Sequence, residues 1–258
     1  MSPQRKKIIA LSALALSSAA FAQTKAPEPD YTLAYTAGLV TEYRYRGISQ
    51  SGKKPALQGS MDFAHKSGAY VGLWASTITW IKDSGSGTKG PVEADIYGGY
   101  KGAITDTISY DVGGLQYWYI NNNLSSLGAG YANANTFELY GAVTAGPATV
   151  KYSRSMTNLF GYVNSKGSGY LDASATFDVG NGFSVVPHVG YQTVKNVNNV
   201  NYTDYSLALN KDFDGLVLSA TFVGTNYKNK NGIAYQLPGS GSKDLAGNTL
   251  VLGIKKNF

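Results

Sequence analysis

The sequence contains no cysteine and only two histidines. Exported soluble domains often use disulfides to stiffen a small core, so closure of a large sheet must stabilise this chain instead. No cluster of histidine, aspartate and glutamate has the spacing of a metal site. We therefore expect no metal, no cofactor and no catalytic residues.

Long apolar runs are also missing after residue 22, where no stretch reaches the 18 or so residues that indicate a membrane-spanning helix. Long amphipathic helical patterns are not evident either. The aromatic content is high, with 20 Tyr, 9 Phe and 3 Trp. Tyrosine and tryptophan suit a membrane–water interface, and an alternating strand can face lipid on one side and water on the other. This composition favours strands in a membrane over a soluble β-sandwich.

The N-terminus predicts export. Residues 5–7 are basic, residues 8–21 are apolar, and an A-x-A pattern ends at Ala22. These features predict a signal peptide over residues 1–22, cleaved after Ala22. A membrane anchor is disfavoured because the apolar run is shorter than the roughly 20 residues of a span. Loss of the three basic residues lowers the net charge from +6 to +3, so nucleic acid is not an implied partner.

The polar, proline-rich residues 23–31 form the expected leader, and residues 32–258 the expected barrel. Twelve segments of this region are long enough to cross a bilayer when tilted, which takes roughly 9–11 residues. They are 32–46, 55–65, 69–81, 92–102, 107–120, 135–146, 148–158, 169–179, 183–194, 202–212, 216–227 and 248–258.

The connections alternate in length. Those after the even-numbered segments are short and contain Gly, Asn or Asp, which supply the positive φ of tight hairpins. The others are mostly longer and polar, as in 82–90, 121–134 and 228–247. Outer-membrane barrels have short periplasmic turns, longer external loops and an even number of strands. The sequence thus predicts an all-β, antiparallel, up-and-down transmembrane β-barrel.

Alternation within the strands assigns the two faces. Apolar residues such as Phe177, Leu207 and Leu252 share one parity, and they should face lipid because an exposed Lys or Arg there costs about 2–4 kcal/mol. The alternate positions, which carry the charged residues, should face the lumen. The candidate lumen or constriction residues are Glu42, Arg44, Arg46, Asp62, Glu93, Asp95, Lys101, Asp111, Glu138, Lys151, Asp172 and Asp204.

Glu42, Arg44 and Arg46 share one face of the first predicted strand. They could form a charged constriction that selects solutes by its field, or salt bridges that hold neighbouring strands in register. A twelve-stranded barrel is narrow, and opposed charges could nearly close it. We expect passage of small solutes, with the oligomeric state open.

Several other residues have two interpretations. Trp74, Trp80, Tyr117, Trp118 and Tyr119 could line a sugar track, but interfacial girdles are favoured.

His188 falls on the lumen face of its strand and is expected to be a hydrogen-bonded structural residue. His65 lies beside a short turn and should mark the membrane–water interface. His65 is the only histidine on the apolar parity, and it lies near the periplasmic end. An outer-surface Ser–His pair of the kind found in phospholipase barrels is therefore not expected. Residues 85–90 match G-x-G-x-x-G, but a strand rather than a helix follows, so a flexible loop is expected.

The terminal Phe258 resembles the signal by which assembly machinery recognises outer-membrane barrels, although Lys256 departs from the usual apolar residue. The segments 42–50 (EYRYRGISQ), 55–59 (PALQG) and 68–74 (GAYVGLW) are similar to the start of the TorF family of proposed porins, also known as the Gcw_chp conserved hypothetical outer-membrane proteins. The resemblance implies an outer-membrane barrel with a porin role.

The implied partners are outer-membrane lipid and lipopolysaccharide, the barrel-assembly machinery during biogenesis, and small solutes. A plugged structural or surface-binding barrel without transport is the alternative. A soluble periplasmic β-protein is the third hypothesis.

Overall fold

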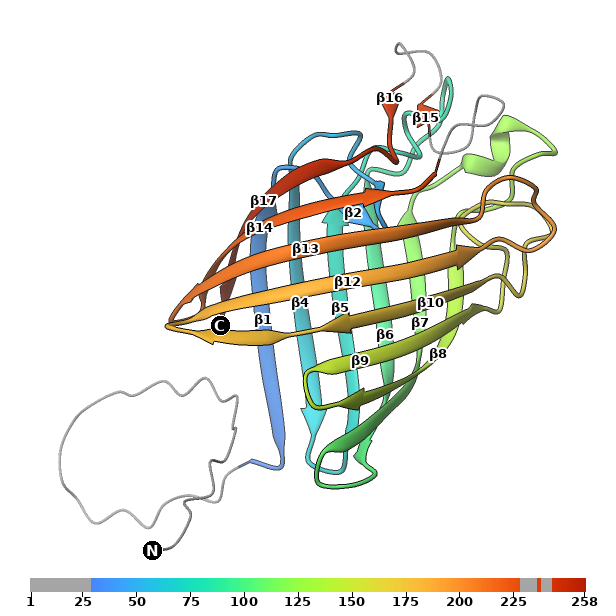
Figure 1. The fold of residues 1–258 in the computed structure, drawn as a ribbon. Coiled ribbons are helices and arrows are strands. Elements are labelled where there is room, and N and C mark those ends of the chain that lie inside the picture. The colour runs from blue at the N-terminus through green and yellow to red at the C-terminus, as the bar shows by residue number, and fades with distance from the viewer. Residues whose placement is uncertain (1–28, 228–235, 238–242) are drawn as a thin grey trace, which may run out of the picture.

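The computed structural model describes residues 29–227, 236–237 and 243–258, and they form a closed antiparallel barrel (Figure 1). The barrel strands are β1 (Tyr31–Val40), β4 (Ala56–His65), β5 (Ala69–Thr77), β6 (Val92–Ala103), β7 (Ile108–Ile120), β8 (Thr136–Ala145), β9 (Ala148–Ser155), β10 (Gly169–Ala175), β11 (Phe177–Gly180), β12 (Phe183–Thr193), β13 (Tyr202–Phe213), β14 (Leu216–Thr225) and β17 (Thr249–Asn257).

Each strand pairs with its neighbours in sequence, and β1 closes the barrel against β17. Strands β10 and β11 both pair with β12 and are two parts of one wall segment, interrupted at Thr176. The wall therefore has twelve segments, which confirms the predicted fold class. The predicted signal peptide and most of the predicted leader lie outside the described residues.

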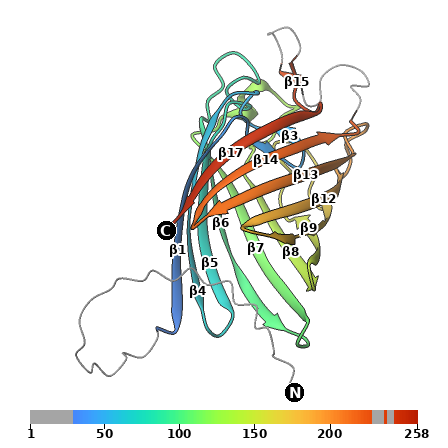
Figure 2. The ribbon, with the colours of Figure 1, turned by 60° about the vertical axis from the view of Figure 1, so that its left-hand side comes forward.

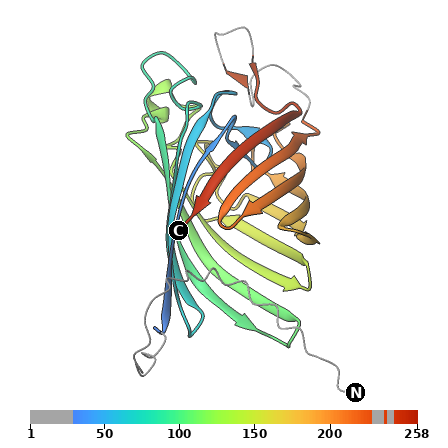
Figure 3. The same ribbon diagram turned by 90° about the vertical axis from the view of Figure 1, so that its left-hand side faces the viewer.

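The two ends of the barrel differ. Tight turns at one end contain positive-φ residues such as Gly68, Asn181 and Gly215, as expected from their sequence. The C-terminus and the start of β1 lie toward this short-turn end, and longer connections gather at the other, the long-loop end (Figure 2). The long loops include η1 (Leu124–Leu127), β15 (Gln236–Leu237) and β16 (Lys243–Asp244). Strands β13, β14 and β17 are strongly tilted (Figure 3).

The wall is apolar outside and polar inside. Leu207, Leu252 and Phe177 are about half exposed on the outer surface, at 52, 50 and 47%, which confirms the predicted parity. Glu93, Glu138 and other residues of the opposite parity are buried inside. A soluble monomer rarely exposes so large an apolar surface, so this exterior fits a lipid environment. None of the described helices is long and apolar enough to span a membrane.

The C-terminal residue continues the wall. The amide of Phe258 donates to the carbonyl of Tyr35 at 2.9 Å, which extends the contact between β17 and β1. The Phe258 side chain is 69% exposed. The use of Phe258 as an assembly signal stays a prediction.

The first predicted strand, 32–46, is wrong beyond Val40. Strand β1 ends there, and residues 41–55 turn into the lumen, where they contain the short strands β2 (Arg44–Tyr45) and β3 (Ile48–Ser49). We call residues 41–55 the lumen hairpin. Arg46 and Gly47 have φ of 46° and 76°, the positive values that a two-residue hairpin loop requires. Glu42, Arg44 and Arg46 therefore leave the barrel wall altogether.

Candidate functional site

The tip of the lumen hairpin is bound to two wall strands, β8 and β12, which are separated by β9 and β10. Arg46 Nη2 contacts Glu138 Oε2 of β8 at 2.7 Å, and Nη1 contacts Oε1 at 3.1 Å. Nη1 also donates to Gln192 Oε1 of β12 at 2.8 Å. The Arg46 guanidinium stacks over the Tyr170 ring at 4.1 Å. A bidentate arginine–carboxylate pair fixes both distance and orientation, so the hairpin crosses the lumen in one defined position.

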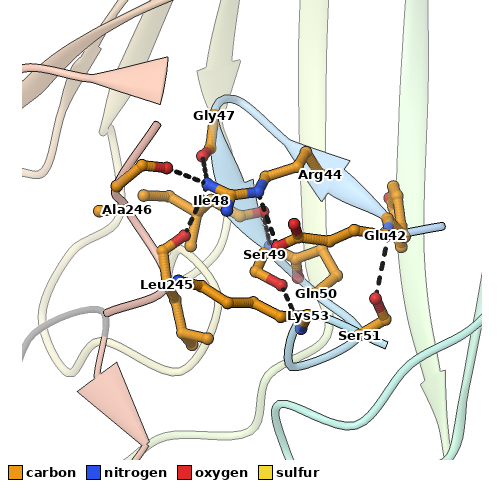
Figure 4. Close-up of polar contacts among 12 residues, drawn as sticks. Glu42, Arg44, Gly47, Ile48, Ser49, Gln50, Ser51, Lys53, Leu245 and Ala246 are labelled. Atoms are coloured by element: carbon orange, nitrogen blue, oxygen red, sulfur yellow. Dashed lines mark hydrogen bonds and ion pairs between the residues drawn. The ribbon is translucent and has the colours of Figure 1, made fainter. Parts of the chain in front are cut away.

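A second arginine joins the lumen hairpin to a long loop (Figure 4). Arg44 Nε donates to Glu42 Oε1 at 2.8 Å. Its Nη1 donates to the carbonyls of Gly47, Leu245 and Gly247 at 2.9, 3.0 and 2.8 Å. Because Leu245 and Gly247 follow β16, Arg44 couples the hairpin to the segment that leads into β17.

The hairpin also covers two buried carboxylates of β6. Tyr43 donates to Glu93 Oε1 at 3.4 Å, and Asp95 lies two residues further on the same strand face. Burial, reinforced by the charges of Glu93 and Asp95, raises the pKa of Tyr43 well above its ordinary value. The phenol therefore keeps its proton and can serve as a donor.

An aromatic cluster packs around the lumen hairpin. Tyr43 packs on Trp74 at a ring-centroid distance of 5.2 Å, and Trp80 packs on Tyr119 at 5.4 Å. The Tyr117 hydroxyl donates to Glu138 Oε2 at 3.2 Å. Tyr117 and Tyr119 are only 1–2% exposed, so these rings are packing surfaces rather than an open track.

The favoured girdle interpretation is thus wrong for four of the five aromatic residues. Tyr117 and Tyr119 share the lumen parity of β7, and Trp74 and Trp80 pack against buried rings of the lumen cluster. Only Trp118 lies on the outer surface, at 48% exposure. The other four rings support the lumen hairpin instead of facing the membrane interface.

A cavity of about 520 Å³ lies beside the hairpin and is lined by residues of both charge signs, including Lys151, Asp172, His188 and Asp204. His188 Nε2 contacts Asp172 Oδ2 at 2.8 Å, and Tyr170 donates to Asp204 Oδ2 at 3.0 Å. His188 is therefore a hydrogen-bonded lumen residue, as expected. The lining offers donors and acceptors without a strong excess of one charge.

The remaining candidates lie apart from the hairpin. Tyr97 donates to Asp62, and Lys101 Nζ lies 3.8 Å from Asp111 Oδ2. Lys101 is well exposed, with 63% of its side chain accessible. The structure brings together Glu42, Arg44, Arg46, Glu93, Asp95 and Glu138 around the hairpin, and places Lys151, Asp172 and Asp204 around the cavity.

Three residues of the site were not predicted from the sequence. Tyr45 belongs to the hairpin, and Gln192 and Tyr170 both contact Arg46. Residues 85–90 form a loop without a helix after them, as predicted. Within the described parts of the chain, no group of three or more His, Cys, Asp or Glu side chains could hold a metal ion.

Two porins are among the solved structures with a similar fold. The chain is similar to the KdgM porin with a TM-score of 0.52 and 8% identity, over 88% of this chain and 98% of that one. It is similar to the NanC porin with a TM-score of 0.52 and 10% identity, over 88% of this chain and 99% of that one. At such low identity, the likeness concerns the fold alone.

No curated protein sequence matches the chain. The model of a family described as "Bacterial protein of unknown function (Gcw_chp)" matches residues 24–258. This match confirms the Gcw_chp resemblance, whereas the TorF name stays a prediction. The chain therefore belongs to the Gcw_chp family of bacterial proteins.

Proposed function

We propose that this protein is an outer-membrane channel for the passive passage of small polar solutes, as the TorF resemblance implies. The porin-like fold suggests the outer membrane, and the apolar exterior supports that placement. In outer-membrane barrels the short turns are periplasmic and the long loops external. The lumen hairpin then lies in the external half of the barrel, with the start of β1 and Phe258 on the periplasmic side.

The observation that carries this proposal is the polar cavity beside a hairpin that narrows the lumen. Twelve strands enclose a narrow barrel, and the hairpin reduces its section further. The cavity lining pairs Lys151 and His188 with Asp172 and Asp204. A balanced field of this kind favours small uncharged or zwitterionic solutes over ions of one sign.

The test is swelling of liposomes that contain the purified, refolded protein, in a panel of amino acids, monosaccharides, larger oligosaccharides and salts. We expect swelling with the small solutes and none with the oligosaccharides. Protein-free liposomes are the control. If no solute of the panel causes swelling while the protein is folded in the bilayer, the transport proposal is wrong.

A plugged barrel that binds partners through its loops is the second candidate, and the burial of the Arg46–Glu138 pair favours it. Their side chains are only 5 and 2% exposed. Replacement of loop 121–134 would discriminate between the two functions. Loss of a surface-binding phenotype without a change in permeability would support the plugged barrel.

We also propose that the protein is not an enzyme. His65 Nδ1 lies 2.8 Å from Ser67 Oγ, but this exposed pair is at the short-turn end. Among the described ion pairs and hydrogen bonds, none joins the His65 ring to a carboxylate that could orient it. Incubation with phospholipid vesicles should release no fatty acid.

A further inference from the structure

A cleft of about 1000 Å³ lies on the outer wall at the long-loop end. Its base is formed by Leu139 of β8 and Arg154 of β9. The loops 156–168 and 194–201 overhang it, and Asn196 Nδ2 donates to the Asn164 carbonyl at 2.9 Å, which ties the two loops together. The cleft is therefore formed by two loops that are hydrogen-bonded to each other, together with the barrel wall beneath them.

Cationic groups converge in this cleft. Gly167 has a φ of 89°, and the position that a Cβ would take on it lies 3.5 Å from Arg154 Nη2 and 3.8 Å from Lys195 Nζ. Lys166, the preceding residue, also lines the cleft. The bare Cα of Gly167 thus leaves an open space between two cations that come from β9 and from the loop after β12.

Among the residues that the structure describes, these cations have no counter-ions. The ion pairs among the described residues include Arg44 and Arg46 but none of Arg154, Lys166 and Lys195. Like charges that are held close together repel one another, and an anion between them removes that cost. The cleft is accordingly suited to an anionic group.

The position of the cleft points to an amphiphilic ligand. Outward residues of β9 change from Val150 to Tyr152 to Arg154 toward the long-loop end, with about 7 Å along the strand between one and the next. Exposed Leu139 and Met156 line the same cleft as the cations. Apolar side chains at membrane depth and cations just above them match acyl chains that carry a phosphorylated headgroup.

We propose that this cleft binds a phosphate group of lipopolysaccharide in the outer leaflet, with Arg154 and Lys195 as its principal ligands. The guanidinium of Arg154 can form two parallel hydrogen bonds to phosphate oxygens, and Leu139 and Met156 contact the lipid chains. This inference rests on the outer-membrane placement proposed above, but it does not require an open lumen.

Binding of purified lipopolysaccharide to the refolded full-length protein in detergent tests the proposal. The Arg154→Gln/Lys195→Gln variant should bind about tenfold or more weakly. Lys255→Gln/Lys256→Gln is the matched control, because it removes two positive charges from β17 and should bind as the wild type does. Dephosphorylated lipopolysaccharide should bind the wild type as weakly as intact lipopolysaccharide binds the cleft variant.

Equal binding by both double variants would overturn the proposal, as would equal binding of dephosphorylated lipopolysaccharide. Millimolar inorganic phosphate should compete poorly, because it lacks the acyl chains, and full competition would mean a free-phosphate site instead. Heat modifiability on gels shows whether each variant is folded. Conductance in bilayers without lipopolysaccharide should be the same for the cleft variant and the wild type, so a failed channel and a failed lipid site give different results.

Discussion

Arg46 and Glu138 lie 92 residues apart in the sequence and meet inside the barrel at 2.7 Å, almost completely shielded from solvent. One partner is at the tip of the lumen hairpin and the other is in the wall strand β8. Removal of one member of a buried ion pair leaves an uncompensated charge, which typically costs about 3–5 kcal/mol. The position of the hairpin therefore depends strongly on this pair.

Glu138→Gln should release the hairpin from the wall. Because the chain lacks cysteine, Ser49→Cys, at a fully buried hairpin position, gives a single thiol as a reporter. We expect slow reaction with a membrane-impermeant thiol reagent in the Ser49→Cys protein, and reaction at least about tenfold faster when Glu138→Gln is added.

Asp30→Asn is the control for this experiment, because Asp30 pairs with Lys66 on the exposed surface. Exposed pairs contribute about 0–1 kcal/mol, so Ser49→Cys should stay protected. Equal protection in the Glu138→Gln background would show that the Arg46–Glu138 pair does not hold the hairpin.

Arg44→Lys should loosen the segment before β17 even though the charge is kept. A lysine cannot reproduce the planar fork that contacts Glu42 and three backbone carbonyls. We expect faster cleavage near residues 243–248 by an external protease. Arg154→Lys, on the outer wall, is the matched control and should leave the cleavage rate unchanged. If the Arg44→Lys protein resists the protease as well as the wild type does, Arg44 does not hold the segment before β17 in place.

Gly47→Ala should destabilise the docked hairpin. A Cβ on Gly47 would lie 2.6 Å from Thr225 Cγ2 and 2.7 Å from Asp204 Cβ, at a positive φ. Strain and overpacking of this kind cost about 1–3 kcal/mol. Gly130→Ala, with nothing within 4 Å of its Cβ position, should be near neutral. Urea unfolding in micelles, followed by tryptophan fluorescence, measures both, and equal midpoints would contradict the predicted packing.

Leu207→Lys should weaken folding into lipid vesicles by about 2–4 kcal/mol, because Leu207 faces outward near the middle of β13. Ser206→Lys places the same charge one residue away, beside the polar cavity, and should cost much less. The free energy of folding in each case comes from denaturant titration with vesicles. A larger loss for Ser206→Lys would mean that the two faces have been assigned the wrong way round.

The wall was predictable because its period-two pattern has a simple physical cause: one face meets lipid and the other meets water. The lumen hairpin was not predictable, because its short strands β2 and β3 are also extended and continue the same alternation. Two signals were present. The first predicted segment, at 15 residues, was the longest of the twelve, and Gly47 fell just after its end.

The aromatic lumen cluster could have been found from parity. Tyr117 and Tyr119 share the parity of Asp111 in β7, whereas Trp118 has the opposite parity. Interface preference outweighed that alternation in the sequence-based interpretation. The partners of Arg46 could not be predicted, since Glu138 and Gln192 come from distant strands whose stagger around the barrel sets their height in the lumen.

Single-channel conductance in planar bilayers tests most directly whether the lumen hairpin narrows the pore. The variant to compare with the wild type has residues 42–54 replaced by a glycine–serine linker of equal length, and it should fold because the wall contacts of β1 and β4 remain. We predict small or rare conductance steps for the wild type and clearly larger, more frequent steps for the variant. Equal conductance in the two folded proteins would contradict this account.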